Sequence, residues 1–232
     1  MWENDYDLSG AARESLGSYT AKTFVWMCLG LLTTFLVAVL GYVTNAIYFI
    51  FAIPFMHIIL PVAELAVVII LSARLQRLSI GAARGLFFTY AVLTGVVFSA
   101  YFLIFGMGTL ILVFLMTSLY FAGMAAYGYF TKTDLSRLRP ILVGGLIFLI
   151  IFGLLSLFLP FGAMDRVVCL IGVAIFLGFT AYDTQKIQQY YYAFQHDSAM
   201  LERASIISAL GLYLDYINLF LYLLRFLGKN RK

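Results

Sequence analysis

The chain has 232 residues, of which 63% are hydrophobic and only 11% are charged, and its formal net charge at pH 7 is +4. This composition excludes a soluble domain, because a core of this size needs a charged surface to enclose it. The small basic excess is spread over loops between apolar segments, so we expect no nucleic-acid partner.

Apolar runs of about 18 residues or more recur along the chain, which is typical of an all-α polytopic membrane protein. The first run begins near Thr23 and no A-x-A-like cleavage site follows it, so we predict a true span rather than a signal peptide. Cys28 and Cys169 both lie inside predicted spans, and we therefore expect no disulfide.

In chain order, residues 1–22 are polar and are predicted to form a cytoplasmic tail. A transmembrane domain, residues 23–228, is predicted to follow, and residues 229–232 form a short basic C-terminal tail. The domain contains seven predicted spans, over residues 23–43, 56–73, 85–105, 110–130, 140–159, 166–186 and 205–227.

Prolines and glycines mark the predicted boundaries. Pro54 and Pro61 are expected to divide the long apolar stretch 44–73 into an interfacial or loop piece and the second span. Gly106-Met107-Gly108 and Pro160-Phe161-Gly162 are expected to form tight turns.

Basic residues follow the second and fourth spans, among them Arg74, Arg84 and Arg137. The positive-inside rule places these loops, and with them the N-terminus, in the cytoplasm. Seven spans then put the basic C-terminal tail outside, unless the last span is a re-entrant hairpin. We favour seven full spans.

Two carboxylates, Asp183 and Asp215, lie within or at the end of the last two spans. A carboxylate at such depth costs about 2.5–3.5 kcal/mol on insertion scales, so it needs a partner or a function. Polar or small residues recur on the last span at helical spacing, which predicts one polar face and a central position for this helix. They are Ser208, Gly211, Asp215, Asn218, Tyr222 and Arg225.

We expect Asp183 and Asp215 to approach each other if the last helix starts late or the helices tilt. Two carboxylates that share a site do not both ionise at little cost, so they titrate as a unit. Such a pair forms a pH-sensitive latch or a cation site, and Ca²⁺ prefers oxygen ligands of this kind. The alternative is a structural pair that shares a proton, or two unrelated helix caps.

Other polar residues in the spans leave alternatives open. Glu64 is part of an ion path or lies in an interfacial pocket near the outer side. Arg74 is a counter-charge for Asp183 or Asp215, or an interfacial arginine that sets topology, which we favour. Asn218 lines a path or hydrogen-bonds a neighbouring helix.

Two motifs carry a family resemblance. They are Ala181-Tyr182-Asp183-Thr184-Gln185 and Leu212-Tyr213-Leu214-Asp215-Tyr216-Ile217-Asn218-Leu219-Phe220. Together they resemble the C-terminal signature of the Bax inhibitor-1 family, and Tyr127-Gly128-Tyr129-Phe130-Thr131-Lys132-Thr133-Asp134-Leu135-Ser136 is similar to its bacterial members.

The resemblance implies a seven-helix fold with a central last helix and a pH-dependent Ca²⁺ leak. The pH-sensing aspartates of the family match Asp183 and Asp215. Arg74 is the nearest candidate for the family's arginine latch, and Glu64 matches an acidic position on its second helix. The bacterial character of the motifs implies an inner-membrane location.

We therefore predict a pH-dependent calcium leak with its path along Asn218 and Tyr222, with Ca²⁺ as transported or bound ion and no other cofactor. The alternative is a non-conducting regulator that binds a membrane-bound protease or another membrane partner. Tyr182-Asp183 and Asp215 also resemble the aspartate motifs of intramembrane aspartyl proteases. Leu214 occupies the place of that motif's second glycine and no Pro-Ala-Leu motif occurs, so we expect no enzyme.

Overall fold

The computed structural model describes residues 14–74, 77–156, 158–159 and 164–228, and within these ranges every regular element is helical. The elements are α1 (Leu16–Val43), α2 (Ala46–Ala52), α3 (Met56–Ala73), α4 (Ile80–Ile104), α5 (Met107–Phe130), the short 3-10 helix η1 (Leu135–Leu138), α6 (Arg139–Leu155), α7 (Met164–Phe194) and α8 (Ser198–Gly228).

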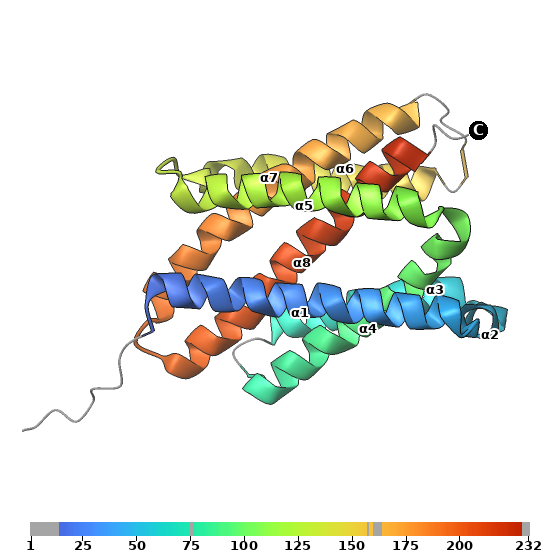
Figure 1. Cartoon of the computed structure of the whole chain (residues 1–232). Helices are drawn as coiled ribbons and strands as arrows, with labels where there is room; N and C mark the ends of the chain where they lie inside the picture. The colour runs from blue at the N-terminus through green and yellow to red at the C-terminus, as the bar shows by residue number, and fades with distance from the viewer. Residues whose placement is uncertain (1–13, 75–76, 157, 160–163, 229–232) are drawn as a thin grey trace, which may run out of the picture.

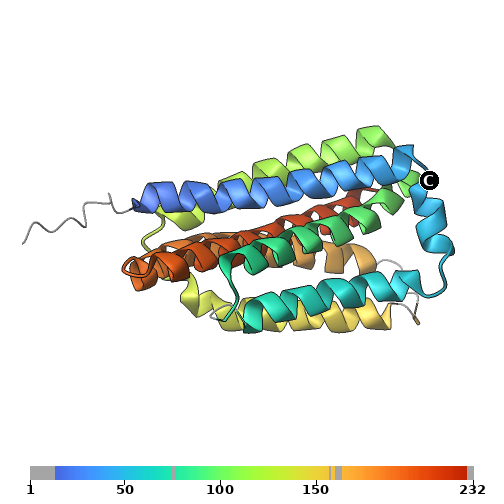
Figure 2. The ribbon, with the colours of Figure 1, turned by 90° about the horizontal axis from the view of Figure 1, so that it is seen from below.

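Seven of these helices are long and apolar enough to cross a membrane: α1, α3, α4, α5, α6 with its preceding η1, α7 and α8. Successive spanning helices run in opposite directions between the two ends of the bundle (Figures 1 and 2). Large hydrophobic side chains such as Phe49, Leu119 and Phe158 are exposed on the outside of the bundle. An apolar exterior over seven spanning helices is that of an integral membrane protein.

The last helix, α8, is the centre of the bundle, as its polar face predicted. In its most apolar window 67% of the residues are buried, against 11% to 44% in the other six spanning helices. It packs against α1, α4, α5 and α7, which surround it. In Figure 1 it passes diagonally behind α1 and α5.

The helix boundaries confirm some expectations and correct others. The second span is confirmed at α3, Met56–Ala73, but Pro61 lies inside this helix and only Pro54 separates it from α2. Pro61 is the sixth residue of α3, beyond the first four N–H groups, so it removes the one hydrogen bond that an N–H at this position would make to the His57 carbonyl, and the helix continues past it. The first helix begins at Leu16, so residues 16–22 of the expected tail are helical.

The last two helices extend well beyond their predicted spans. Helix α7 continues to Phe194 and α8 begins at Ser198, so most of the expected polar connection between them is helical. Helix α8 is continuous and ends at Gly228, at the opposite end of the bundle from Leu16 (Figure 2). The re-entrant hairpin is therefore excluded. The predicted turn at Pro160-Phe161-Gly162 lies outside the described residues.

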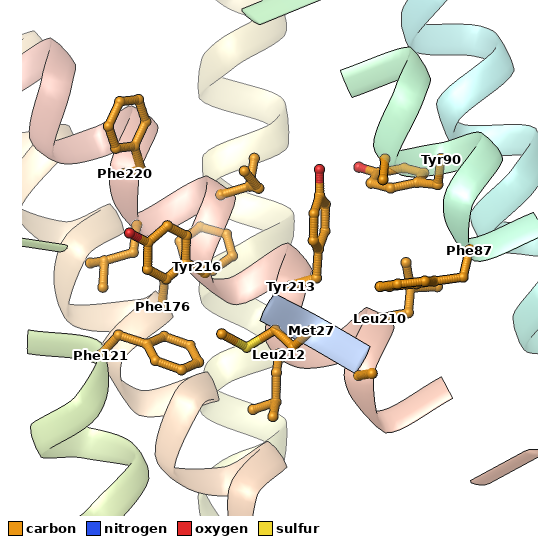
Figure 3. Packing of buried hydrophobic residues seen from close by; sticks show 14 of the residues in the cluster. Met27, Phe87, Tyr90, Phe121, Phe176, Leu210, Leu212, Tyr213, Tyr216 and Phe220 are labelled. Atoms are coloured by element: carbon orange, nitrogen blue, oxygen red, sulfur yellow. The ribbon is translucent and has the colours of Figure 1, made fainter. Parts of the chain in front are cut away.

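The middle of α8 is anchored by Tyr213, whose side chain is completely buried. Its ring meets those of Phe87 and Tyr90 edge-on, with centroids 6.0 and 5.6 Å away (Figure 3). The Thr34 hydroxyl lies 2.6 Å from the Tyr213 hydroxyl and donates to the Ala91 carbonyl at 2.8 Å. This contact joins α1, α4 and α8 in the interior of the bundle.

A group of charged residues joins the same three helices at the end of the bundle where α1 begins. Glu202 on α8 forms ion pairs with Lys22 on α1 and with Arg84 on α4, the latter at 2.6 Å. The Arg84 guanidinium also lies 5.0 Å from the centroid of the Trp26 ring. We call Lys22, Arg84 and Glu202 the basal ion cluster.

We predict that the basal ion cluster stabilises the fold by a salt-sensitive interaction. A double-mutant cycle with Lys22→Gln, Glu202→Gln and the double variant should give a coupling energy of about 0.5–1 kcal/mol, because the pair is partly exposed. The measurement is unfolding in detergent at low and at about 1 M salt, where screening should reduce the coupling. A coupling of zero at low salt would contradict the prediction.

Candidate functional site

The structure brings Asp183 of α7 and Asp215 of α8 together, although α8 starts earlier than expected and not later. Asp215 is only 5% exposed, and its Oδ2 atom has no hydrogen-bond partner among the described residues. Asp183 is the anionic group that acts electrostatically on Asp215. The two carboxylates thus form one site at the α7–α8 interface, which we call the aspartate pair.

A glycine on α8 allows this approach. A Cβ atom added at Gly211 would lie 2.8 Å from Asp183 Oδ2, so the carboxylate rests directly on the backbone of α8. Gly211 lies about one turn before Asp215, and Asp183 therefore reaches the level of Asp215 from its position beside Gly211. Both helices extend beyond the predicted spans. Asp183 therefore lies about 16 Å before the end of α7, and Asp215 lies about 26 Å after the start of α8.

The cation beside the pair is Lys186, which the sequence analysis did not single out. Its Nζ atom lies 4.0 Å from Asp183 Oδ1, one turn further along the same helix. It also lies 5.9 and 5.3 Å from the ring centroids of Tyr182 and Tyr190, which hold the ammonium group by cation–π contact. Lys186 acts on both aspartates, so one positive charge faces two carboxylates.

Arg74, the counter-charge that the sequence suggested, lies at the exposed C-terminal cap of α3. The ion pairs among the described residues connect it to neither Asp183 nor Asp215. In this conformation the structure places Lys186, and not Arg74, beside the aspartate pair. A latch formed by Arg74 stays a prediction.

The polar face of α8 is turned towards α7 over several turns. Tyr222 stacks on Phe176 with ring centroids 5.8 Å apart, and Arg225 pairs with Asp165 at 3.8 Å. The Asn218 side chain instead donates to the Leu214 carbonyl of its own helix at 2.8 Å. The predicted polar face of α8 is thus part of the α7–α8 interface. The stack of Tyr222 on Phe176 closes this interface on the C-terminal side of Asp215.

Glu64 belongs to a separate polar cluster. Its Oε1 atom is buried on α3 beside Thr94 of α4, and its charge acts on Tyr90 and Tyr213. Tyr213 and Asp215 are two residues apart on α8 and therefore project to nearly opposite sides of the helix. The structure does not bring Glu64 to the aspartate pair.

The motif around Asp183 contacts the stretch 127–136 that is similar to bacterial members of the family. The Gln185 side chain accepts from the Leu135 N–H and donates to the Thr133 carbonyl, both at 2.9 Å. Gln188 donates to the Tyr129 carbonyl at 2.7 Å. The helix that carries Asp183 is thereby fixed to the connection between α5 and α6.

The aspartate pair does not form a complete metal site. Ca²⁺ takes six to eight oxygen ligands. In the described part of the chain no group of three or more His, Cys, Asp or Glu residues is arranged to hold a metal ion. The pair therefore suits brief contact with a partly hydrated cation better than permanent binding of one.

We predict that Gly211→Ala displaces Asp183 from α8. The added Cβ is too close to Asp183 Oδ2, so the variant should lose about 1–3 kcal/mol of unfolding free energy in detergent. Gly153→Ala in α6 is the matched control, because nothing lies within 4 Å of its Cβ position. The control should be neutral or up to about 1 kcal/mol more stable. Equal effects of the two substitutions would contradict the proposed contact.

We also predict that Gln185→Ala loosens the link between α7 and the α5–α6 connection. It removes two hydrogen bonds to backbone groups, which should lower the unfolding free energy by about 1–3 kcal/mol. Gln189→Ala is the control, because Gln189 is exposed on the same helix. Thermal unfolding of both variants in detergent measures the difference, and an unchanged midpoint for Gln185→Ala refutes the prediction.

Comparison with known proteins agrees with this architecture. The family model described as "Inhibitor of apoptosis-promoting Bax1" matches residues 16–232. The inner membrane protein YbhL of Escherichia coli K12 is 40% identical over 223 residues, which cover 94% of each chain. Uncharacterized proteins of Borreliella burgdorferi and Rickettsia prowazekii are 38% and 37% identical and cover 97% and 94% of this chain, and 98% and 92% of their own. The chain belongs to the Bax inhibitor family of membrane proteins.

Proposed function

We propose that the protein is a proton-controlled cation leak, with Ca²⁺ as the transported ion, and that the aspartate pair is its gate. The observation that carries this proposal is the meeting of Asp183 and Asp215 at a buried helix interface, where Lys186 is the one cation among the described residues that acts on both. An arrangement built only for stability would match each buried charge with its own counter-charge.

The charge on the pair depends on pH. With one proton shared between the carboxylates, the single remaining negative charge is balanced by Lys186. When both carboxylates are ionised, the site carries an uncompensated negative charge in a medium of low dielectric constant, where repulsion is strong. The structure represents the closed arrangement in this scheme, since Asp183 rests against Gly211 and Tyr222 stacks on Phe176.

Repulsion between the ionised carboxylates acts across the α7–α8 interface. Separation of these helices would expose Asp215, Asn218 and Tyr222 in sequence along α8, which are the oxygen-bearing groups of its polar face. A hydrated divalent cation is attracted by the two carboxylates and completes its coordination with water. The leak therefore opens as pH rises and closes as the pair takes up a proton.

The distribution of charge supports an orientation with the N-terminus in the cytoplasm. The basal ion cluster, Arg74 and the connection between α5 and α6 all lie at the end where α1 begins. At the opposite end the described charged residues are Asp165, Arg166 and Arg225. By the positive-inside rule the first end faces the cytoplasm, and the bacterial relatives indicate the plasma membrane.

We predict that purified protein in liposomes releases Ca²⁺ at a rate that rises between about pH 5 and pH 8. Asp183→Asn and Asp215→Asn each remove the second negative charge, so neither variant should show this rise. Asp134→Asn is the matched control, because Asp134 is exposed on the connection between α5 and α6 and its amide can still cap η1, and it should retain the wild-type pH profile. The measurement is dye-reported Ca²⁺ flux across a pH series.

The outcomes separate conduction from a purely structural pair. A pH-dependent flux in wild type that Asp183→Asn and Asp215→Asn both abolish and Asp134→Asn keeps would support the gate. Flux that is absent at every pH, or unchanged in both variants, would refute it. The aspartate pair would then be structural, and the function would lie in binding a membrane partner such as a membrane-bound protease.

A further inference from the structure

A groove on the outside of the bundle reaches the central helix, whose Tyr216 and Phe220 at the inner wall of the groove are only 4% and 6% exposed. It lies between α1 and α5, which flank α8 without closing over it (Figure 1). Its volume is about 660 Å³, and its walls come from α1, α4, α5 and α8. Residues that line it include Leu31, Phe35, Phe114, Leu115, Tyr216 and Phe220. We call it the α1–α5 groove.

Most of the hydroxyl groups that line this groove already have partners within the protein. The Tyr216 hydroxyl lies 2.8 Å from the Ser118 hydroxyl and donates to the Phe114 carbonyl at 3.4 Å. The Thr34 hydroxyl donates to the Ala91 carbonyl. Besides these, the lining contains the Tyr101 hydroxyl, and its other residues are almost all apolar. A polar ligand would therefore gain few hydrogen bonds in the groove, and an apolar ligand fits its walls better.

The size of the groove distinguishes between two apolar occupants. Along α1 it extends from Phe24 to Ala38, about 21 Å of helix. A transmembrane helix about 10 Å wide fills roughly 1,600 Å³ over that length, more than twice the volume of the groove. A hydrocarbon chain is much thinner. If a methylene group occupies roughly 30 Å³, like a water molecule, the groove accommodates about twenty carbon atoms.

We propose that the α1–α5 groove is a binding site for one acyl chain of a membrane phospholipid. The chain lies along α1, covers Tyr216 and Phe220 of α8, and leaves its headgroup outside the groove. One leaflet of the hydrocarbon core is about 15 Å deep, so the groove is long enough for a chain that enters from either leaflet. The proposal of a lipid site does not depend on whether the protein conducts ions or on the role of the aspartate pair.

The test uses purified full-length protein in a mild detergent, with 1-palmitoyl-2-oleoyl phosphatidylglycerol added and bound lipid counted by native mass spectrometry. Wild type should retain one phospholipid. Ala122→Phe places a ring in the groove, because Ala122 lines it, and should reduce retention at least fivefold. Ala126→Phe, on the same helix and exposed but outside the groove lining, should retain lipid as wild type does.

A second pair of variants guards against misfolding of Ala122→Phe. Leu115→Trp enlarges an exposed side chain of the groove wall, and Leu119→Trp enlarges an exposed side chain of α5 outside it. The first should lower lipid retention several-fold and the second should not, with equal thermal unfolding midpoints for both.

Three results would overturn the proposal: no retained lipid in wild type, equal loss in groove and control variants, or a strong headgroup preference. Phosphatidylcholine with the same chains should bind within about twofold of phosphatidylglycerol, because the headgroup lies outside the groove. A tenfold preference for the anionic lipid would place the site at charged residues instead.

Discussion

The contact between Asp183 and the backbone at Gly211 is the constraint on which the α7–α8 arrangement depends. It brings a second carboxylate beside Asp215 in the interior of a membrane protein, where ionised groups are costly. The surrounding helices support this contact. Gly128 of α5 packs directly on the Ala181 backbone, and Gln185 fixes α7 to the connection between α5 and α6. The position of Asp183 is thereby determined from two sides.

The parts of the fold that follow from hydropathy and helical period were predictable. Apolar length identified seven spanning segments, and it located α3 to the residue because polar sequence follows Ala73 at once. The period of polar residues on α8 predicted a central helix, since a polar face in a membrane must be turned away from lipid. The meeting of Asp183 and Asp215 followed from the same reasoning together with the family resemblance.

The remainder depends on tertiary contacts that sequence spacing does not determine. The sequence suggests Arg74 as a counter-charge because it is an arginine near the end of a span. The structure instead places Lys186 beside Asp183, and the i+3 spacing of these two residues is visible in the sequence. The predicted end of α7, Lys186, is too early, and the predicted start of α8, Ser205, is too late, because hydropathy falls where the helices leave the apolar region. The helices continue there, since polar residues such as Glu202 find partners on α1 and α4.

Helix α8 therefore presents two different surfaces from adjacent residues. Asp215 faces α7 at the proposed gate, and Tyr216 faces the α1–α5 groove, where we propose that a lipid chain binds. Any displacement of α8 away from α7 changes the volume available beside Tyr216 and Phe220. A flexible hydrocarbon chain adapts to such a change more readily than a packed side chain, because close-packed cores respond to a change of even one methylene group. With a lipid chain in the groove, the movement of α8 that the proposed gate requires would need less repacking of side chains than it would in a fully packed bundle.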